Sequence, residues 1–249
     1  MKLWFSIYDE TLYQGSEKSF YESEHYDWAK EILSQREIIV KEFYEVIKTE
    51  KLFDPYFNQM LTSHKGMWQT IGLKFWTINN YKNQAYFPNT TKVINKIPNL
   101  VSASFNKLQG GTDIKPHCGD TNGIFRCHLG IEIPAGLPNC GFEVNKEQRE
   151  WKTDDLIIFC DAHNHTAWNH SNNDRYIFLF DIIRDEYKPK KNVIVSTVLS
   201  SMFLQKIALL LINMKQESNF KRSNLKPIVF ILKPFAKLAV WYVNRFKVY

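Results

Sequence analysis

Cysteine is scarce in this chain. It occurs four times among 249 residues, and no two cysteines form a Cys-x-x-Cys pair. This is too few for a fold held together by disulfides in a chain of this length, and the spacing gives weak support to a cysteine-rich zinc site. The sequence therefore favours reduced thiols in a cytosolic protein.

Long uninterrupted hydrophobic runs are also missing. The N-terminus reaches Asp9 and Glu10 before the apolar segment of a secretory signal could form, so we expect no signal peptide. Residues 193–214 are apolar but broken by serine, glutamine and lysine, and residues 228–249 contain Pro234 and four cations. A spanning helix needs about 20 largely apolar residues. Both segments are therefore predicted to be basic amphipathic helices, interfacial or packed on the core.

Acidic residues are nearly absent from the C-terminal part. Residues 187–249 contain 12 lysines and arginines but one acid, Glu217, whereas residues 1–186 contain 20 basic and 25 acidic residues. The net charge of +6 thus belongs to the tail. A basic tail with apolar segments fits peripheral binding to an anionic membrane, on the inner face for a cytosolic protein. The competing interpretation is a helical cap with solvated lysines, and no motif indicates nucleic-acid binding.

A hydrophobic share of 44% with 15% aromatic residues is typical of a globular protein. Apolar residues recur at three- and four-residue steps from about 23 to 48, which predicts a helix. Residues 67–76 could form a strand or simply contribute to the core. Phe87-Pro88 and Ile97-Pro98 bracket a short helical segment, because each proline disfavours helix at the preceding residue.

From Leu100 the hydrophobic pattern changes to a period of two. Residues 124–133 show it most clearly, since Arg126 and His128 share one face while Phe125, Cys127 and Leu129 take the other. Short strands at this spacing indicate a β-sandwich or barrel. The predicted strands are 100–107, 124–133, 141–144, 149–152, 155–159 and 175–183.

Two histidines, His117 and His165, lie on either side of several of these predicted strands in the sequence. Non-haem iron enzymes commonly hold Fe(II) with two histidines and a carboxylate, in which the acid lies two residues after the first histidine. Here that position is Gly119, and Asp120 lies one residue too far. On spacing alone the usual triad is incomplete.

Residues 100–185 nevertheless resemble the aspartyl/asparaginyl β-hydroxylase family of Fe(II)/2-oxoglutarate dioxygenases. In the best-known members of that family two histidines hold the iron without a carboxylate, and a glycine stands where the acid would be, as Gly119 does here. The order of the matching segments is more specific than any one of them. They are Gly111-Thr-Asp-Ile-Lys-Pro-His-Cys-Gly119, Arg126-Cys-His-Leu-Gly-Ile-Glu-Ile-Pro134, Trp151 with Ile158-Phe159, His165-Thr-Ala-Trp168 and Asp174-Arg-Tyr-Ile-Phe178.

The resemblance implies a mainly β fold with a double-stranded β-helix (jelly-roll, cupin-like) core over residues 99–186. A helical N-terminal part, 1–98, and a basic helical tail, 187–249, would flank this core. The resemblance also implies that Fe(II), 2-oxoglutarate and O2 take part in the reaction. It assigns His117 and His165 to iron and Arg175 to the distal carboxylate of 2-oxoglutarate, with His128 and Arg126 nearby. Asn106 occupies a position where the family often has a serine that contacts the cosubstrate.

Several alternatives stay open in the sequence. His163 and His170 compete with His165, Asp120 could stand in for the missing acid, and Cys118 could be a zinc ligand or a bystander thiol. Members of the family hydroxylate aspartyl or asparaginyl side chains, free amino acids or lipid acyl chains. We expect an aspartyl- or asparaginyl-type acceptor in a peptide or amino acid. The alternatives are a membrane-lipid acyl chain, since the tail loosely resembles that of bacterial lipid hydroxylases, and a catalytically silent, membrane-associated metal-binding adaptor.

Overall fold

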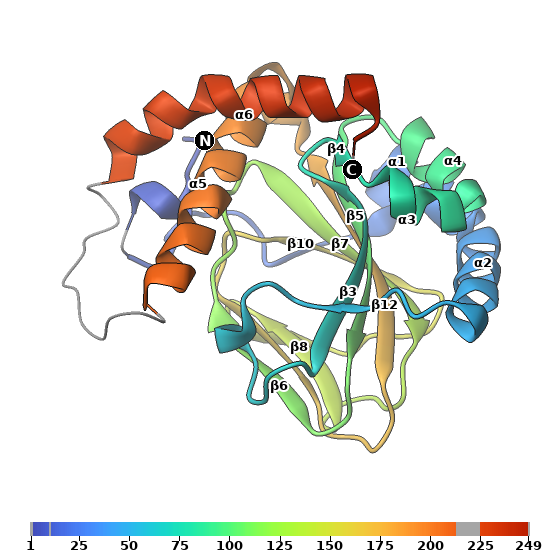
Figure 1. Cartoon of the computed structure of the whole chain (residues 1–249). Coiled ribbons are helices and arrows are strands. Elements are labelled where there is room, and N and C mark those ends of the chain that lie inside the picture. The colour runs from blue at the N-terminus through green and yellow to red at the C-terminus, as the bar shows by residue number, and fades with distance from the viewer. Residues whose placement is uncertain (1, 10, 213–224, 249) are drawn as a thin grey trace.

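The fold is built on two antiparallel β-sheets that face each other in a computed structural model describing residues 2–9, 11–212 and 225–248 (Figure 1). The larger sheet has eight strands in the order β1-β10-β7-β12-β5-β3-β2, with β4 paired to β3, and the smaller has four in the order β6-β11-β8-β9. The larger sheet comprises β1 (Phe20–Tyr21), β2 (Asp54–Pro55), β3 (Trp68–Phe75), β4 (Ile78–Asn79), β5 (Leu100–Leu108), β7 (Ile124–Glu132), β10 (Leu156–Cys160) and β12 (Arg175–Ile183). The smaller sheet comprises β6 (Thr112–His117), β8 (Cys140–Val144), β9 (Glu147–Arg149) and β11 (His165–Asn169).

This arrangement is the predicted double-stranded β-helix with flanking helices. Side chains from both sheets meet in one apolar layer, for example Leu108 and Ile177 of the larger sheet with Phe142 and Ala167 of the smaller. β1 and β3, which precede residue 99, are part of the larger sheet. The N-terminal segment therefore completes the barrel wall as well as supporting it.

The alternation in β7 and β12 decides which side chains face the space between the sheets. Phe125, Cys127 and Leu129 of β7 are buried on the helix side, whereas Arg126 and His128 line the inner cavity. In β12, Phe178, Phe180 and Ile182 take the helix side, and Arg175, Ile177 and Leu179 face the cavity. The period of two thus places Arg126, His128 and Arg175 toward the cavity, together with Ile177 and Leu179, and leaves only apolar groups among the side chains named on the helix side.

Four helices cover the outer face of the larger sheet: α1 (Asp27–Ser34), α2 (Arg36–Thr49), α3 (Tyr81–Tyr86) and α4 (Pro88–Lys96). The predicted helix over 23–48 is divided at Gln35, where the Arg36 guanidinium donates to the Leu33 carbonyl and satisfies an acceptor at the end of α1. α4 begins at Pro88 as predicted, and the Glu42 carboxylate accepts from the N–H groups of Asn89 and Thr90. Short 3-10 helices lie at Ser6–Tyr8, Ser23–His25, Gln59–Leu61 and Asp185–Lys190.

The predicted hairpin after residue 140 is present, but its second strand is shifted. Asn145 and Lys146 both have positive φ, 50° and 70°, as a tight two-residue hairpin turn requires. β9 therefore starts at Glu147 rather than 149 and ends at Arg149, before Trp151. Trp151 is released from the strand and turns its buried indole toward the cavity.

The two C-terminal helices differ in burial. α5 (Lys191–Ile212) packs on the core through Ile194, Val198 and Met202, and its hydroxyls, such as that of Ser200, hydrogen-bond to carbonyls of the same helix. Of the two predicted arrangements, interfacial or packed on the core, α5 adopts the second. α6 (Lys226–Phe246) crosses the top of the molecule and is mostly exposed (Figure 1). Part of the 193–214 segment, residues 213 and 214, lies outside the described residues, as does Tyr249.

Candidate functional site

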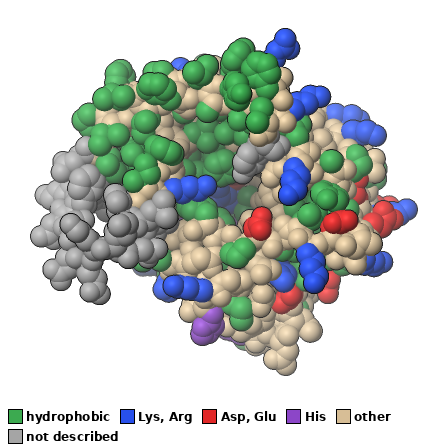
Figure 2. Space-filling view, in the orientation of Figure 1, with side chains coloured by type: hydrophobic (Ala, Val, Ile, Leu, Met, Phe, Trp, Pro, Cys, Tyr) green, Lys and Arg blue, Asp and Glu red, His purple; other side chains and the backbone are tan. Residues whose placement is uncertain are grey.

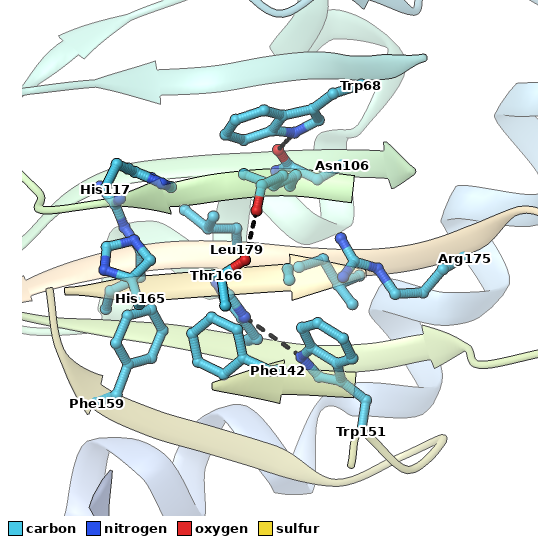
Figure 3. Close-up of a pocket in the computed structure, with 15 residues that line it drawn as sticks. Trp68, Asn106, His117, Phe142, Trp151, Phe159, His165, Thr166, Arg175 and Leu179 are labelled. Atoms are coloured by element: carbon cyan, nitrogen blue, oxygen red, sulfur yellow. Dashed lines mark hydrogen bonds between the residues drawn. The ribbon is translucent and has the colours of Figure 1, made fainter. Parts of the chain in front are cut away.

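A cavity between the two sheets collects most of the predicted site residues. It encloses ≈ 430 Å³ of space, open solvent at its mouth included. His117 and His165 lie at one end and Arg175 with Trp151 at the other, with Phe142, Thr166 and Leu179 between them (Figure 3). The cavity therefore has two polar ends separated by a largely apolar middle.

The two histidines are brought together by the pairing of β6 with β11. His117 is the last residue of β6, His165 is the first of β11, and the two are direct register partners. Their ring centroids are 4.2 Å apart. Side chains opposite each other on antiparallel strands project on the same face, so both imidazoles point to one place at the cavity mouth.

The hydrogen bonds of both rings select the tautomer that a metal needs. Nδ1 of His117 lies 2.8 Å from the Lys115 carbonyl, and Nδ1 of His165 lies 2.8 Å from the His163 carbonyl. A carbonyl only accepts, so each Nδ1 carries the proton and each Nε2 keeps its lone pair. Burial lowers the pKa of His117 and lowers that of His165 well below its usual value. Both rings are therefore neutral near pH 7, as metal ligands must be.

A carboxylate fills the place of the acid that the sequence lacks. A Cβ added at Gly119 would overlap the Asp161 carboxylate, which follows β10. The Gly119 N–H donates to the Asp161 main-chain carbonyl at 2.8 Å, which holds the two segments together. Asp161 Oδ1 lies 3.8 Å from His165 Nε2. Among the described residues no group of three or more His, Cys, Asp or Glu is placed to hold a metal, so neither Asp161 nor Asp120 completes a triad here.

Arg126 is held between two buried acids. Its Nη1 lies 2.6 Å from Asp161 Oδ1, while its Nε and Nη2 donate to the two oxygens of Asp181 at 2.9 and 3.1 Å. Burial raises the pKa of Asp161 to about 7, and the nearby Arg126 opposes that rise. All three nitrogens of the Arg126 guanidinium are thus engaged by protein carboxylates. The proposed contact of Arg126 with the cosubstrate stays a prediction.

The far end of the cavity has buried donors without acceptors. Arg175 is 2% exposed, and its guanidinium stacks over the Trp151 ring at 4.1 Å. Within the part of the chain that the structure describes, Nε and Nη1 of Arg175 and the buried Nε2 of His128 have no hydrogen-bond partner. Burial lowers the pKa of Arg175 to about 10, so the group stays cationic near pH 7. A buried, unsatisfied cation is costly, which points to an anionic ligand at this end.

Trp151 sets the tautomer of His128. Its indole N–H donates to His128 Nδ1 at 3.3 Å, so the proton of the imidazole resides on Nε2. Burial, reinforced by Arg175, lowers the pKa of His128 well below its usual value, so the ring is a neutral donor. His128 Nε2–H and two Arg175 N–H groups therefore form a donor set suited to a carboxylate.

The remaining candidates lie in different surroundings. Asn106 lines the cavity, but its amide accepts from the Trp68 indole at 3.1 Å and donates to Ser104 Oγ at 2.8 Å. His163 contacts the Glu17 carbonyl through Nε2 at 2.8 Å, away from the cavity. His170 contacts Asp113 at 2.7 Å on the exposed surface. Of the three distal histidines, His165 alone faces His117.

The sequence reasoning missed Asp161 and gave Trp151 no role. The signal for Asp161 was an acid directly after the apolar run of β10 and four residues before His165. Such a place predicts burial, and a buried acid needs a partner. Trp151 was expected in the strand over 149–152, but β9 ends at Arg149, so its contacts with Arg175 and His128 depend on the fold.

Comparisons with known proteins identify the family of this chain. The sequence profile of the family described as Aspartyl/Asparaginyl beta-hydroxylase matches residues 34–185, more than half of the chain. The chain belongs to the aspartyl/asparaginyl β-hydroxylase family. The match extends beyond the barrel to α2–α4 of the N-terminal segment, so the family match includes these helices as well as the barrel.

Relatives in the family carry two kinds of name. An ornithine lipid ester-linked acyl 2-hydroxylase of Rhizobium tropici is 28% identical over 178 residues, 70% of this chain and 63% of that protein. The human aspartyl/asparaginyl beta-hydroxylase is 28% identical over 109 residues, 42% of this chain and 14% of that protein. The chain thus spans less than two thirds of either relative. The solved structure of a Pseudomonas putida prolyl-4-hydroxylase aligns with 60% of this chain and with 87% of the hydroxylase chain, at a TM-score of 0.40 and 11% sequence identity.

Proposed function

We propose that the protein is an Fe(II)/2-oxoglutarate-dependent dioxygenase that hydroxylates an unactivated C–H bond. The observation that carries the proposal is that one cavity has two different polar ends. One end holds two neutral histidines with both Nε2 lone pairs available, and the other holds buried Arg175 and His128 donors without acceptors. Such a cavity suits a metal at its mouth and a dicarboxylate that reaches its far end.

In this proposal each residue has a defined task. His117 and His165 hold the iron, whose chemistry when bound is to couple oxidation of 2-oxoglutarate by O2, giving succinate and CO2, to insertion of the second oxygen atom into the acceptor C–H bond. Arg175 and His128 hold the distal carboxylate and so orient the cosubstrate. Asp161, which pairs with Arg126, lies beside His165. Asn106 contributes to the wall through its bond with Trp68.

The acceptor that we propose is an acyl chain of a membrane lipid. The cations among the described cavity-lining residues are Arg126 and Arg175, and Arg126 is already engaged by Asp161 and Asp181. An aspartyl acceptor would bring a carboxylate with no cation left to meet it, at a considerable desolvation cost. The exposed apolar side chains of α6, such as Phe235 and Trp241, instead suit contact with a lipid. The aspartyl- or asparaginyl-type acceptor expected from the sequence remains the competing candidate, as does a small-molecule or peptide substrate.

The proposed acceptor also determines where the enzyme works. We propose a cytoplasmic enzyme that associates with the inner face of an anionic membrane through the 187–249 tail. Three of its four cysteines, Cys127, Cys140 and Cys160, are buried thiols without a disulfide, which is compatible with a reducing compartment. We expect no nucleic-acid partner.

The proposal is tested by incubating the protein with Fe(II), 2-oxoglutarate, O2 and a bacterial lipid extract. We expect succinate formation, together with a lipid fatty-acyl product heavier by one oxygen atom. A parallel incubation with aspartyl- and asparaginyl-containing peptides measures the competing acceptor. Oxygen gain on peptides alone would exclude the lipid assignment. Absence of succinate in every incubation would favour the silent adaptor.

Removing one N–H group tests the cosubstrate end of the cavity. Trp151→Phe keeps an aromatic ring over Arg175 but deletes the donor to His128 Nδ1. His128 then loses the bond that keeps its proton on Nε2, and we expect the KM for 2-oxoglutarate to rise by about 3–10-fold with little change in kcat. The matched control is Trp168→Phe, whose indole donates at 2.8 Å to Pro138 on the exposed surface. Equal effects of both substitutions would contradict the role of Trp151.

A further inference from the structure

The inner face of α6 is fastened to the folded body at both ends. Near its start Val229 is fully buried in the core that contains Ile194 and Val198, and Lys233 lies over the Tyr8 ring at 5.8 Å. This face repeats at helical spacing, as the less exposed residues of α6 show. They are Val229, Leu232, Lys233, Ala236, Val240, Val243 and Asn244.

The C-terminal end of α6 is held by hydrogen bonds to the opposite side of the body. Asn244 donates to the Thr77 carbonyl at 2.8 Å, and its side-chain oxygen accepts from the Asn79 N–H at 3.1 Å. Its own carbonyl accepts from the Tyr81 hydroxyl at 3.1 Å. With both ends attached, α6 lies flat along the molecule (Figure 1).

The outer face of α6 is apolar and exposed. Phe230 is 74% exposed, Phe235 64% and Trp241 57%. Hydrophobic side chains gather along the upper edge of the molecule, over α6 (Figure 2). Single exposed apolar residues are ordinary on protein surfaces, but a continuous stripe of large ones marks an interaction surface. The members of this outer stripe are Ile228, Phe230, Ile231, Phe235, Leu238, Trp241, Tyr242 and Phe246.

Cations border the outer stripe, and α6 itself contains no acid. Lys226, Lys233 and Lys237 follow one another at steps of seven and four, so they form a single row along one edge of the helix. Arg245 and Lys247 add two charges at the end. Residues 225–248 contain no Asp or Glu. An apolar stripe with a basic border matches the headgroup and upper acyl region of an anionic bilayer.

We infer that α6 is a monotopic anchor that lies in the plane of an anionic membrane, with the outer stripe inserted and the lysine row at the headgroups. The inference rests on the proposed function in that a lipid acceptor requires contact with the bilayer. α6 is long and apolar enough to cross a membrane by length and composition. Crossing, however, would break the Asn244 bonds and carry Lys233 and Lys237 into hydrocarbon, whereas the flat arrangement keeps every observed contact.

Vesicle co-sedimentation of the full chain tests the anchor without requiring turnover. We expect binding to phosphatidylcholine vesicles that contain phosphatidylglycerol and much weaker binding to phosphatidylcholine alone. Phe235→Gln and Trp241→Gln should each weaken binding roughly tenfold, because each removes a large apolar side chain from the bilayer. Lys237→Gln should weaken it roughly fivefold. Leu12→Gln and Met60→Gln, at exposed apolar positions elsewhere, are matched controls and should leave binding unchanged.

The plane of the helix is tested by labelling. Lys226→Cys and Val248→Cys place a thiol near each end of α6, and both should react with a membrane-impermeant maleimide added outside intact vesicles, above the labelling of the parent protein. Reaction at only one end until detergent is added would overturn the flat arrangement. Equal binding by all variants, or no binding together with a dimer that Phe235→Gln dissociates, would overturn the membrane as occupant. Succinate formation measured in the same preparations would keep either failure distinct from failure of the proposed enzyme.

Discussion

Replacing His165 with alanine should abolish 2-oxoglutarate turnover and the stoichiometric binding of Fe(II). His165 and His117 are the histidine pair of the cavity, and no third His, Cys, Asp or Glu among the described residues is placed to compensate. Losing a residue that merely orients a metal ligand typically costs about 10–100-fold in metal affinity or activity, so losing a ligand should cost more than 100-fold. Succinate formation and anaerobic iron titration measure the two effects separately.

The neighbouring histidines supply the control for this experiment. His170→Ala removes an exposed ring whose partner is Asp113, so iron affinity and succinate formation should stay within about twofold of the parent, as surface substitutions usually do. His117→Ala should reproduce the loss expected for His165→Ala, because a single histidine ligand is too few to hold the iron against its hydration by water. Full activity of His165→Ala, or inactivation by His170→Ala, would move the metal site away from the β6–β11 pair.

Replacing Arg175 with methionine should raise the KM for 2-oxoglutarate strongly while stabilising the ligand-free protein. Truncating one partner of a buried charge pair costs about 2–5 kcal/mol, which corresponds to a KM increase of roughly 30-fold or more. In the ligand-free protein, however, Nε and Nη1 of Arg175 have no hydrogen-bond partner among residues 2–9, 11–212 and 225–248. An apolar side chain of similar length removes that desolvation cost, so the free energy of unfolding should rise by about 1 kcal/mol.

The measurement combines steady-state kinetics with urea unfolding in the presence and absence of 2-oxoglutarate. The ligand should stabilise the parent protein, because it binds the folded state, and should leave Arg175→Met unchanged. Iron binding should be retained, since Arg175 lies at the opposite end of the cavity from His117 (Figure 3). An unchanged KM for 2-oxoglutarate would refute the assignment of Arg175.

Arg184 is the matched contrast to Arg175. It is also buried, but its guanidinium lies 3.5 Å from Glu17 and 2.6 Å from Glu186. Arg184→Met would leave the buried Glu17 without its cation, so we expect a destabilisation of about 3–5 kcal/mol. Opposite signs for the two arginine substitutions would separate an arginine that binds a ligand from one that holds the fold.

The alternating pattern in 124–133 placed Arg126 and His128 on one strand face and Phe125, Cys127 and Leu129 on the other, and the structure has the same two faces. Strand periodicity is local, because successive side chains of any strand point to opposite faces. Arg126 and His128 could therefore be assigned to one face without knowledge of the fold, whereas the assignment of Arg175 came from the family resemblance. The absence of an acid at residue 119, combined with the ordered motifs, was likewise sufficient to indicate the family.

Partnerships between distant segments required the tertiary structure. β6 has no clear hydrophobic alternation, and its pairing with β11, which sets His117 against His165, is a matter of register across 48 residues of chain. The same holds for Asp161 occupying the space beside Gly119, and for Arg126 being taken up by two acids. None of these contacts produces a periodic pattern in the sequence, because each depends on which strands lie next to each other in the folded protein.

The C-terminal tail divides in the same way. Its sequence determined the charge, the apolar content and two helices. It could not decide which helix would be covered, because both segments have apolar residues in similar numbers, although residues 193–214 contain one cation and residues 228–249 contain four. Packing decided that: α5 buries Ile194 and Val198 against the barrel, and α6 attaches by one narrow face and leaves Phe230 and Trp241 to solvent. Burial is a property of what packs against a helix, and only the three-dimensional arrangement specifies it.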